Sequence, residues 1–182
     1  TVVLCHDNIY LPRIFDLEDS TARLIAKRLV FASEVEHIAP LMEQIKKEMG
    51  ISLSAKQDKA VRMAFRHNLT IITGSPGTGK TTVLKTILEV YRRQHTDGKI
   101  MLMAPTGRAS RRMAESTGFK EAKTLHSGLG LGSEEDENGR KKEDSLLTAD
   151  LIIVDEFSMV DMWLAKQLFQ RLKDDCRIVL VG

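Results

Sequence analysis

Short apolar runs alternate along this chain with segments in which apolar residues recur every three or four positions. Uninterrupted aliphatic runs occupy 69–73, 100–104, 151–154 and 177–181. Such runs are typical of strands in a parallel sheet that is buried on both faces. Helical periodicity lies between them, most clearly at about 79–94. The pattern therefore predicts an α/β fold, with a mostly parallel sheet covered by helices on both faces.

The first 50 residues have a different pattern. Residues 1–10 suggest one short strand, and helical spacing follows at about 16–31 and again at 35–49. Pro40 lies inside the second helical pattern, so we expect either a kink or a new helix beginning there. These features predict a small helical segment, 1–50, in front of the α/β domain.

A glycine-rich motif follows the first aliphatic run of that domain. Residues 74–81 match G-x-x-x-x-G-K-[ST], in which backbone N–H groups turn toward a phosphate at a helix N-terminus. Lys80 can reach the β- and γ-phosphates, and the Thr81 hydroxyl can bind Mg²⁺. The motif follows a strand and opens an amphipathic helix, as phosphate binding requires. The predicted nucleotide-binding residues here are Gly74, Ser75, Pro76, Gly77, Thr78, Gly79, Lys80, Thr81 and Thr82.

Two carboxylates follow the aliphatic run at 151–154. Asp155 can hold Mg²⁺, and Glu156 can orient and deprotonate an attacking water. Acids at a strand end can also serve only as solvated surface, but their combination with the phosphate loop favours catalysis. The sequence therefore predicts a nucleoside triphosphatase, with Lys80, Asp155 and Glu156 as its catalytic residues.

A Ser-x-x-Gln pattern begins the helix expected at 54–66. Ser54 and Gln57 fit a capping box, in which each side chain bonds the backbone of the other. Gln57 can instead read an adenine edge through its amide. The two roles are compatible only if Gln57 does not fold back on the backbone.

Two further turns follow the second aliphatic run. Ala104-Pro105-Thr106-Gly107-Arg108 comes at the carboxyl end of a strand, where ligands bind in such sheets, and it can also be a plain strand-to-helix turn. The segment 124–127, Thr-Leu-His-Ser, is weak evidence alone.

Charge is distributed unevenly, although the net charge is only +2. Residues 51–130 hold 14 basic and 5 acidic side chains, which suggests an anionic partner such as nucleotide or nucleic acid. Hydrophobic residues at 42% and charged residues at 29% exclude a disordered chain. No apolar run reaches the ~20 residues that cross a bilayer. The two cysteines, far apart, suggest a reducing, cytoplasmic setting without a membrane.

Together these segments resemble the first motor domain of superfamily 1 DNA helicases. The resemblance is closest to the 5′-to-3′ branch that contains RecD-like helicases and the exodeoxyribonuclease V alpha chain. It covers about 51–182, and the continuation Ser-Met-Val-Asp at 158–161 is its most discriminating part. It implies a RecA-like ATPase fold that binds ATP and Mg²⁺, with Gln57 recognising adenine. It also implies contacts with single-stranded DNA, or with a duplex junction, from Pro105, Thr106, Arg108, Thr124 and His126.

The resemblance also bears on the rest of the protein. It implies partner subunits of a nuclease–helicase complex, and it suggests that the insertion at about 128–146 is a pin hairpin; a disordered acidic loop is the alternative. Both ends of the chain look cut from a longer polypeptide, so we expect this piece to hydrolyse ATP poorly and to unwind nothing alone. An ATPase switch or assembly factor acting on a protein partner, an RNA helicase and a non-catalytic nucleic-acid-binding module remain open as alternatives.

Overall fold

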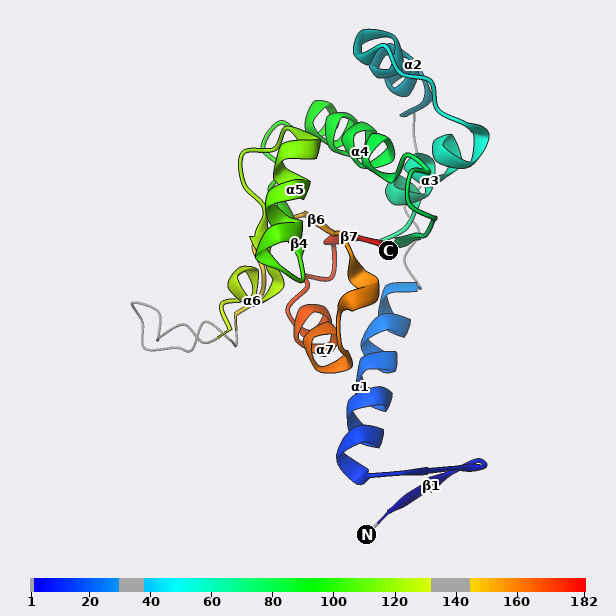
Figure 1. Ribbon diagram of the computed structural model, residues 1–182, viewed down its shortest axis with the longest axis vertical. Helices are drawn as coiled ribbons and strands as arrows, with labels where there is room; N and C mark the ends of the chain where they lie inside the picture. The colour runs from blue at the N-terminus through cyan, green and yellow to red at the C-terminus, as the bar shows by residue number, and fades with distance from the viewer. Residues whose placement is uncertain (1, 30–37, 132–144) are drawn as a thin grey trace.

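The computed structural model describes residues 2–29, 38–131 and 145–182 (Figure 1). At its centre is a parallel five-stranded sheet with the strand order β3-β7-β6-β4-β5. The aliphatic runs form four of these strands, as predicted, and a two-residue strand was not predicted. The strands are β3 (Leu69–Ile72), β4 (Ile100–Ala104), β5 (Lys123–Thr124), β6 (Leu151–Val154) and β7 (Arg177–Val181).

Alternate residues of the central strands belong to two separate cores. Leu151 and Ile153 of β6 lie in one core, whereas Ile152 and Val154 lie in the other. All four side chains are at most 1% exposed. Successive side chains of a strand point to opposite faces, so a run of four aliphatics supplies both cores at once. The predicted sheet with two covered faces is thereby confirmed.

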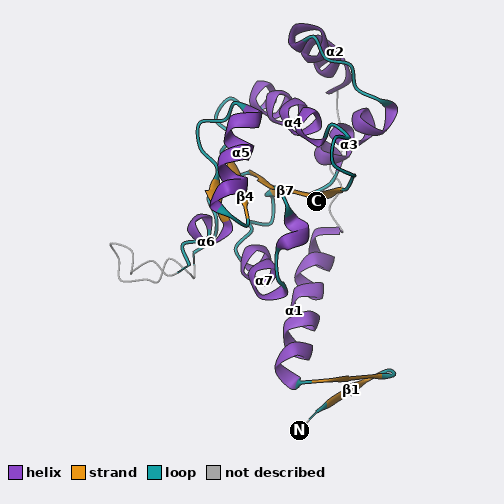
Figure 2. Cartoon of the chain, in the orientation of Figure 1, coloured by secondary structure: helices purple, strands orange, loops and turns teal. Residues whose placement is uncertain are grey.

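Helices cover both faces of the sheet (Figure 2). The first core takes its helical residues from α2 (Ile38–Met49), α3 (Ala55–Arg66), α4 (Lys80–Gln94) and α5 (Gly107–Thr117). The second takes them from α1 (Pro12–Leu29), α6 (Leu125–Gly128) and α7 (Met162–Gln170), with the 3₁₀ helix η2 (Phe157–Met159) before α7. None of the described helices is long and apolar enough to cross a membrane.

The N-terminal segment departs from the sequence prediction. The single strand expected at 1–10 is wrong: β1 (Val3–Cys5) and β2 (Asn8–Tyr10) form an antiparallel hairpin, which turns through His6 at φ +53°. The next helix, α1, begins four residues earlier than expected. Pro40 falls in the first turn of α2, where its missing N–H costs no helical hydrogen bond.

Both long N-terminal helices pack on the α/β domain. Met42 and Ile45 of α2 are fully buried in the first core. Arg28 of α1 donates to the carbonyl oxygens of Leu172 (2.8 Å) and Cys176 (3.2 Å), and it is 7% exposed. Arg28 also donates to the Asp174 carbonyl, so its guanidinium has three hydrogen bonds to carbonyl oxygens. Desolvation by burial lowers the pKa of this guanidinium. The domain boundary predicted at residue 50 stays a prediction.

Candidate nucleotide-binding cleft

The phosphate loop joins β3 to α4 through a turn that needs glycine. Gly77 and Gly79 have φ values of +81° and +80°, in the left-handed region that glycine tolerates best. A Cβ atom on Gly74 would lie 2.6 Å from the Thr78 hydroxyl, which instead donates to the Ser75 carbonyl at 2.8 Å. The glycines therefore permit a compact turn that no other residue type could follow without strain.

The N-terminus of α4 is left open toward this turn. Gly79 occupies the capping position and supplies no side-chain hydrogen bond to the helix. The Lys80 ammonium group lies back on the loop and donates to the Gly74 carbonyl. Gly74 N–H in turn donates to the Gly182 carbonyl (3.3 Å), which ties the start of the loop to the end of β7. The open helix end and the ammonium group together suit an anionic ligand.

Gln57 lies against the loop from the side of α3. Its Oε1 accepts from the Ser54 N–H (2.8 Å) while the Ser54 hydroxyl accepts from the Gln57 N–H (3.3 Å), so the predicted capping box is confirmed. Its Nε2 donates to the Thr78 carbonyl at 3.0 Å. Gln57 thus folds back on the backbone, and its amide would have to exchange both bonds in order to read a base. A Cβ on Gly79 would lie 2.4 Å from that Nε2, which is a second reason for glycine there.

The acidic pair follows β6, two strands away from β3. Asp155 is held by its own N–H, which donates to the Met103 carbonyl at 2.9 Å, and its Oδ1 accepts from the Glu156 N–H at 2.9 Å. Glu156 has φ +54°, which is uncommon and mildly strained for a residue with a side chain. It makes no side-chain capping bond to η2. The turn therefore fixes the backbone of Glu156 and leaves its carboxylate exposed.

One cleft of about 450 Å³ joins these two segments. Of the predicted site residues, it is lined by 75–81 together with Asp155 and Glu156. Gly74, Thr82 and Gln57 are not among the described residues that line it. Thr82 lies in the first turn of α4, where its carbonyl accepts from the Thr86 hydroxyl. The structure thus brings together the phosphate loop and the acidic pair, which are about 75 residues apart in sequence.

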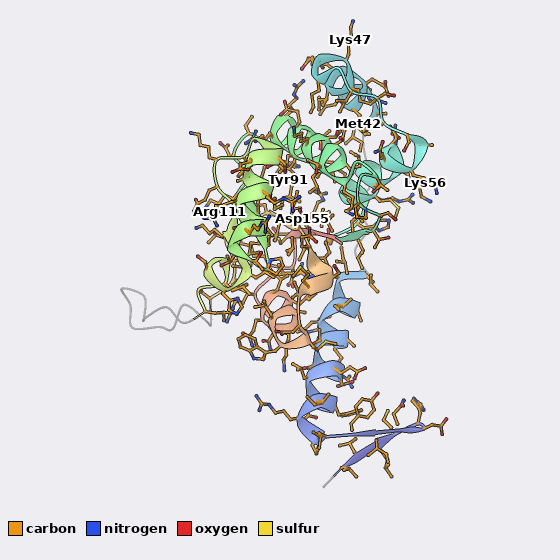
Figure 3. All side chains as sticks on the ribbon, viewed as in Figure 1. Met42, Lys47, Lys56, Tyr91, Arg111 and Asp155 are labelled. Carbon is orange, nitrogen blue, oxygen red and sulfur yellow. The ribbon has the colours of Figure 1, made fainter. Side chains whose placement is uncertain are left out.

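Sequence reasoning missed one wall of the cleft. This wall is α5, which contributes Ala109, Arg112, Met113 and Ser116. Leu84 of α4 lines the cleft as well. The α5 residues recur at helical spacing after the Thr-Gly-Arg turn, a signal that could have found them. Figure 3 shows α5 with Arg111 and the nearby end of β6 with Asp155.

The two predicted nucleic-acid turns lie side by side. Strands β4 and β5 are paired, with Ala104 opposite Thr124, so the turns that follow them leave the same edge of the sheet. Arg108 and His126 are exposed there. The hydroxyls of Thr106 and Thr124 each cap the following helix, accepting from Ala109 N–H and Ser127 N–H at 3.2 Å. Pro105 is half-buried before the first turn.

The donor set of the cleft fits Mg²⁺. A hydroxyl on Thr81 and a carboxylate on Asp155 offer the hard oxygen ligands that this ion prefers, and both line the same cleft. Among the described residues there is no cluster of three His, Cys, Asp or Glu that could hold a metal alone. An ion here would therefore depend on oxygens of a bound phosphate. The predicted pin, centred on 138–139, lies outside the described residues.

Known proteins share this region of the chain. A family model described as an AAA domain matches residues 57–182. The ATP-dependent RecD2 DNA helicase of Deinococcus radiodurans is 32% identical over 174 residues, covering 96% of this chain and 23% of that protein. The RecBCD enzyme subunit RecD of Haemophilus influenzae is 36% identical over 148 residues, covering 69% of this chain and 23% of that protein.

A solved structure agrees with these matches. The Pif1 helicase from Candida albicans has a TM-score of 0.51 and 28% identity, covering 72% of this chain and 32% of that one. This chain spans 23% of the length of each of the two RecD relatives above. The matched family region contains the phosphate loop, the acidic pair and the cleft between them. The chain therefore belongs to the AAA-domain family and is similar to the RecD-like helicases.

Proposed function

We propose that this chain is an ATP-hydrolysing motor domain of a RecD-like DNA helicase, in which hydrolysis drives movement along a single strand and duplex unwinding. One observation carries the proposal: the phosphate loop and the acidic pair line a single cleft. Each segment alone could serve another purpose. Together they supply the phosphate-binding and water-activating groups that hydrolysis needs.

The chain's own residues divide the work of hydrolysis. The Lys80 ammonium group exchanges the Gly74 carbonyl for phosphate oxygens of ATP, to which it is bound more strongly because they are charged. Glu156, fixed by its left-handed backbone and exposed, orients an attacking water and accepts its proton. Thr81 and Asp155, which line the cleft, would hold Mg²⁺. When bound, that ion neutralises charge on the phosphates.

Adenine recognition is assigned to Gln57. Its amide already has two partners, Ser54 N–H and the Thr78 carbonyl, and it contacts the phosphate loop directly. A base edge offering one donor and one acceptor can replace both bonds. We infer that adenine displaces the capping interaction and thereby frees the loop at Thr78.

Single-stranded DNA is assigned to the paired turns after β4 and β5. Arg108 and His126 are exposed after the carboxyl ends of two paired strands, and Pro105, Thr106 and Thr124 belong to the same two turns. The basic excess of residues 51–130 lies in the same part of the chain. These features favour a strand-binding motor over a switch ATPase, which would need neither turn. A strand held there would lie at a duplex junction during unwinding.

The partner and setting follow from the relatives. Several relatives are named as subunits of the RecBCD enzyme, so we propose that subunits of a nuclease–helicase complex bind the full-length protein. The setting proposed is the cytoplasm, consistent with two free cysteines, of which Cys176 is buried and has its pKa raised to about 12 by desolvation.

Unwinding by the full-length protein tests the proposal. Duplexes with a 5′ or a 3′ single-stranded tail, made of DNA or RNA, are incubated with ATP and Mg²⁺ at several salt concentrations. We expect unwinding of the 5′-tailed DNA alone, with strand binding that weakens steeply as salt rises. Strand binding that is absent or does not respond to salt would favour the switch or assembly factor. Unwinding of RNA alone would favour the RNA helicase.

A further inference from the structure

The wall of the cleft formed by α5 carries a cation that the sequence did not assign to the nucleotide. Two cationic side chains occur among the described residues that line the cleft, Lys80 and Arg112. Lys80 already has a partner in the Gly74 carbonyl. Arg112 is exposed and makes no hydrogen bond or ion pair within the part of the chain that the structure describes. Its guanidinium is therefore available to a ligand.

The helix that carries Arg112 is firmly placed. Met113, its neighbour, is 1% exposed and packs in the first core. Ser110 is 4% exposed and donates to the Gly107 carbonyl at 3.1 Å, while Ser116 donates to the Met113 carbonyl at 3.2 Å. Because Ser110 and Met113 on either side of Arg112 are buried against the domain, the side chain of Arg112 leaves from a defined point on the cleft wall.

The place of Arg112 in the cleft indicates which part of a nucleotide it meets. Glu156, proposed to activate water at the terminal phosphate, lines the same cleft. Gln57, proposed to read the base, is not among the described lining residues and bonds the loop from the side of α3. Arg112 thus lines the cleft together with Glu156, whereas Gln57 reaches the phosphate loop from outside the lining, through the Thr78 carbonyl.

We propose that Arg112 binds the terminal phosphate of the nucleoside triphosphate through its guanidinium. A planar guanidinium matches two phosphate oxygens at once, which suits it to a γ-phosphate that carries more charge than either of the other two phosphates. The assignment rests on the proposed ATPase function of the cleft. Arg108 lies one helical turn before Arg112 on the same face of α5, so this one helix also links the triphosphate to the turn assigned to DNA.

Equilibrium binding of ADP and of a non-hydrolysable ATP analogue, both with Mg²⁺, tests this assignment on the full-length protein. Arg112→Gln is compared with the wild type and with Arg111→Gln, a matched control on the same helix that does not line the cleft. We expect Arg112→Gln to weaken the ATP analogue about tenfold or more, as loss of a charge-assisted hydrogen bond should, and to weaken ADP less than about twofold. Arg112→Lys should recover part of the loss, and Arg111→Gln should bind both nucleotides like the wild type.

The outcomes separate the two proposals. If Arg112→Gln binds the ATP analogue as tightly as the wild type, or loses both nucleotides equally, the assignment of Arg112 is wrong while the proposed function stands. If the wild type binds neither nucleotide, or Lys80→Ala binds both like the wild type, the proposed function fails and the inference fails with it. Thermal unfolding midpoints of each variant check that the cleft is folded.

Discussion

Two turns, one after β3 and one after β4, connect the carboxyl end of a strand to a helix. Only the second turn caps its helix with a side chain. The turn before α4 uses left-handed glycines and gives the helix no side-chain cap. The turn before α5 uses Thr106, whose hydroxyl accepts from the Ala109 N–H, and its Gly107 has an ordinary backbone conformation. Backbone N–H groups satisfied by a side chain are not free for an anion. The open helix end, rather than glycine content, therefore distinguishes the proposed phosphate site.

Alanine substitution of one glycine in each turn should give the largest contrast. In Gly79→Ala the new Cβ would meet the Gln57 amide and would force a left-handed backbone, which costs about 1–2 kcal/mol before any clash. Gly107→Ala meets nothing within 4 Å and should leave stability equal or raise it by up to ~1 kcal/mol. Denaturant unfolding and nucleotide titration of both variants check this. Equal losses in the two variants would show that the turns do not differ as described.

Substitution of Gln57 should have an intermediate effect, because Gln57 supports the open turn from outside. Gln57→Ala loses the reciprocal cap and the bond to the Thr78 carbonyl, which together should cost about 1 kcal/mol of unfolding free energy. Gln57→Glu keeps an oxygen for the Ser54 N–H but has no donor for Thr78, so it should recover only the capping part.

The same two variants test the adenine assignment. Both should lose the preference for ATP over GTP, measured by competition binding, since neither side chain offers a donor and an acceptor to the base. A preference retained in Gln57→Glu would leave Gln57 with a structural role alone.

Substitution of Thr106 should have the smallest effect on the cleft. Thr106→Ala removes the cap of α5 and should cost about 1 kcal/mol of stability, whereas Thr106→Ser keeps the hydroxyl and should cost less. Nucleotide affinity should be the same in both, because Thr106 does not line the cleft. A drop in nucleotide affinity with Thr106→Ala that Thr106→Ser repairs would mean that the capped turn also positions the nucleotide.

The sequence predicted most of the sheet because buried parallel strands carry an unmistakable aliphatic signal. The two-residue strand β5 was missed since its pairing depends on β4 rather than on its own side chains. The N-terminal hairpin was missed because Leu4 and Ile9 are exposed, at 73% and 72%, so no buried pattern marks it. Tertiary pairing, not local preference, decides both cases.

In the candidate site too, the residues set by local sequence were predicted and those set by tertiary packing were not. The phosphate loop and the pair Asp155 and Glu156 were found because the chemistry demands particular residues at particular spacing. The α5 wall was not found, since its contribution depends on how that helix packs against α4 and the sheet. The bond from the Gln57 amide to the Thr78 carbonyl was likewise not predicted, because Thr78 is 21 residues away.

We propose that the phosphate loop and the acidic pair form one ATP-hydrolysing site. Steady-state ATP hydrolysis by the full-length protein, with saturating single-stranded DNA, tests it most directly in Lys80→Ala and Glu156→Gln. We predict that both variants lose at least about 100-fold in turnover, because each removes a group required by the reaction, and that Glu156→Gln still binds nucleotide. Undiminished DNA-stimulated turnover in either variant would show that this cleft is not the site of ATP hydrolysis.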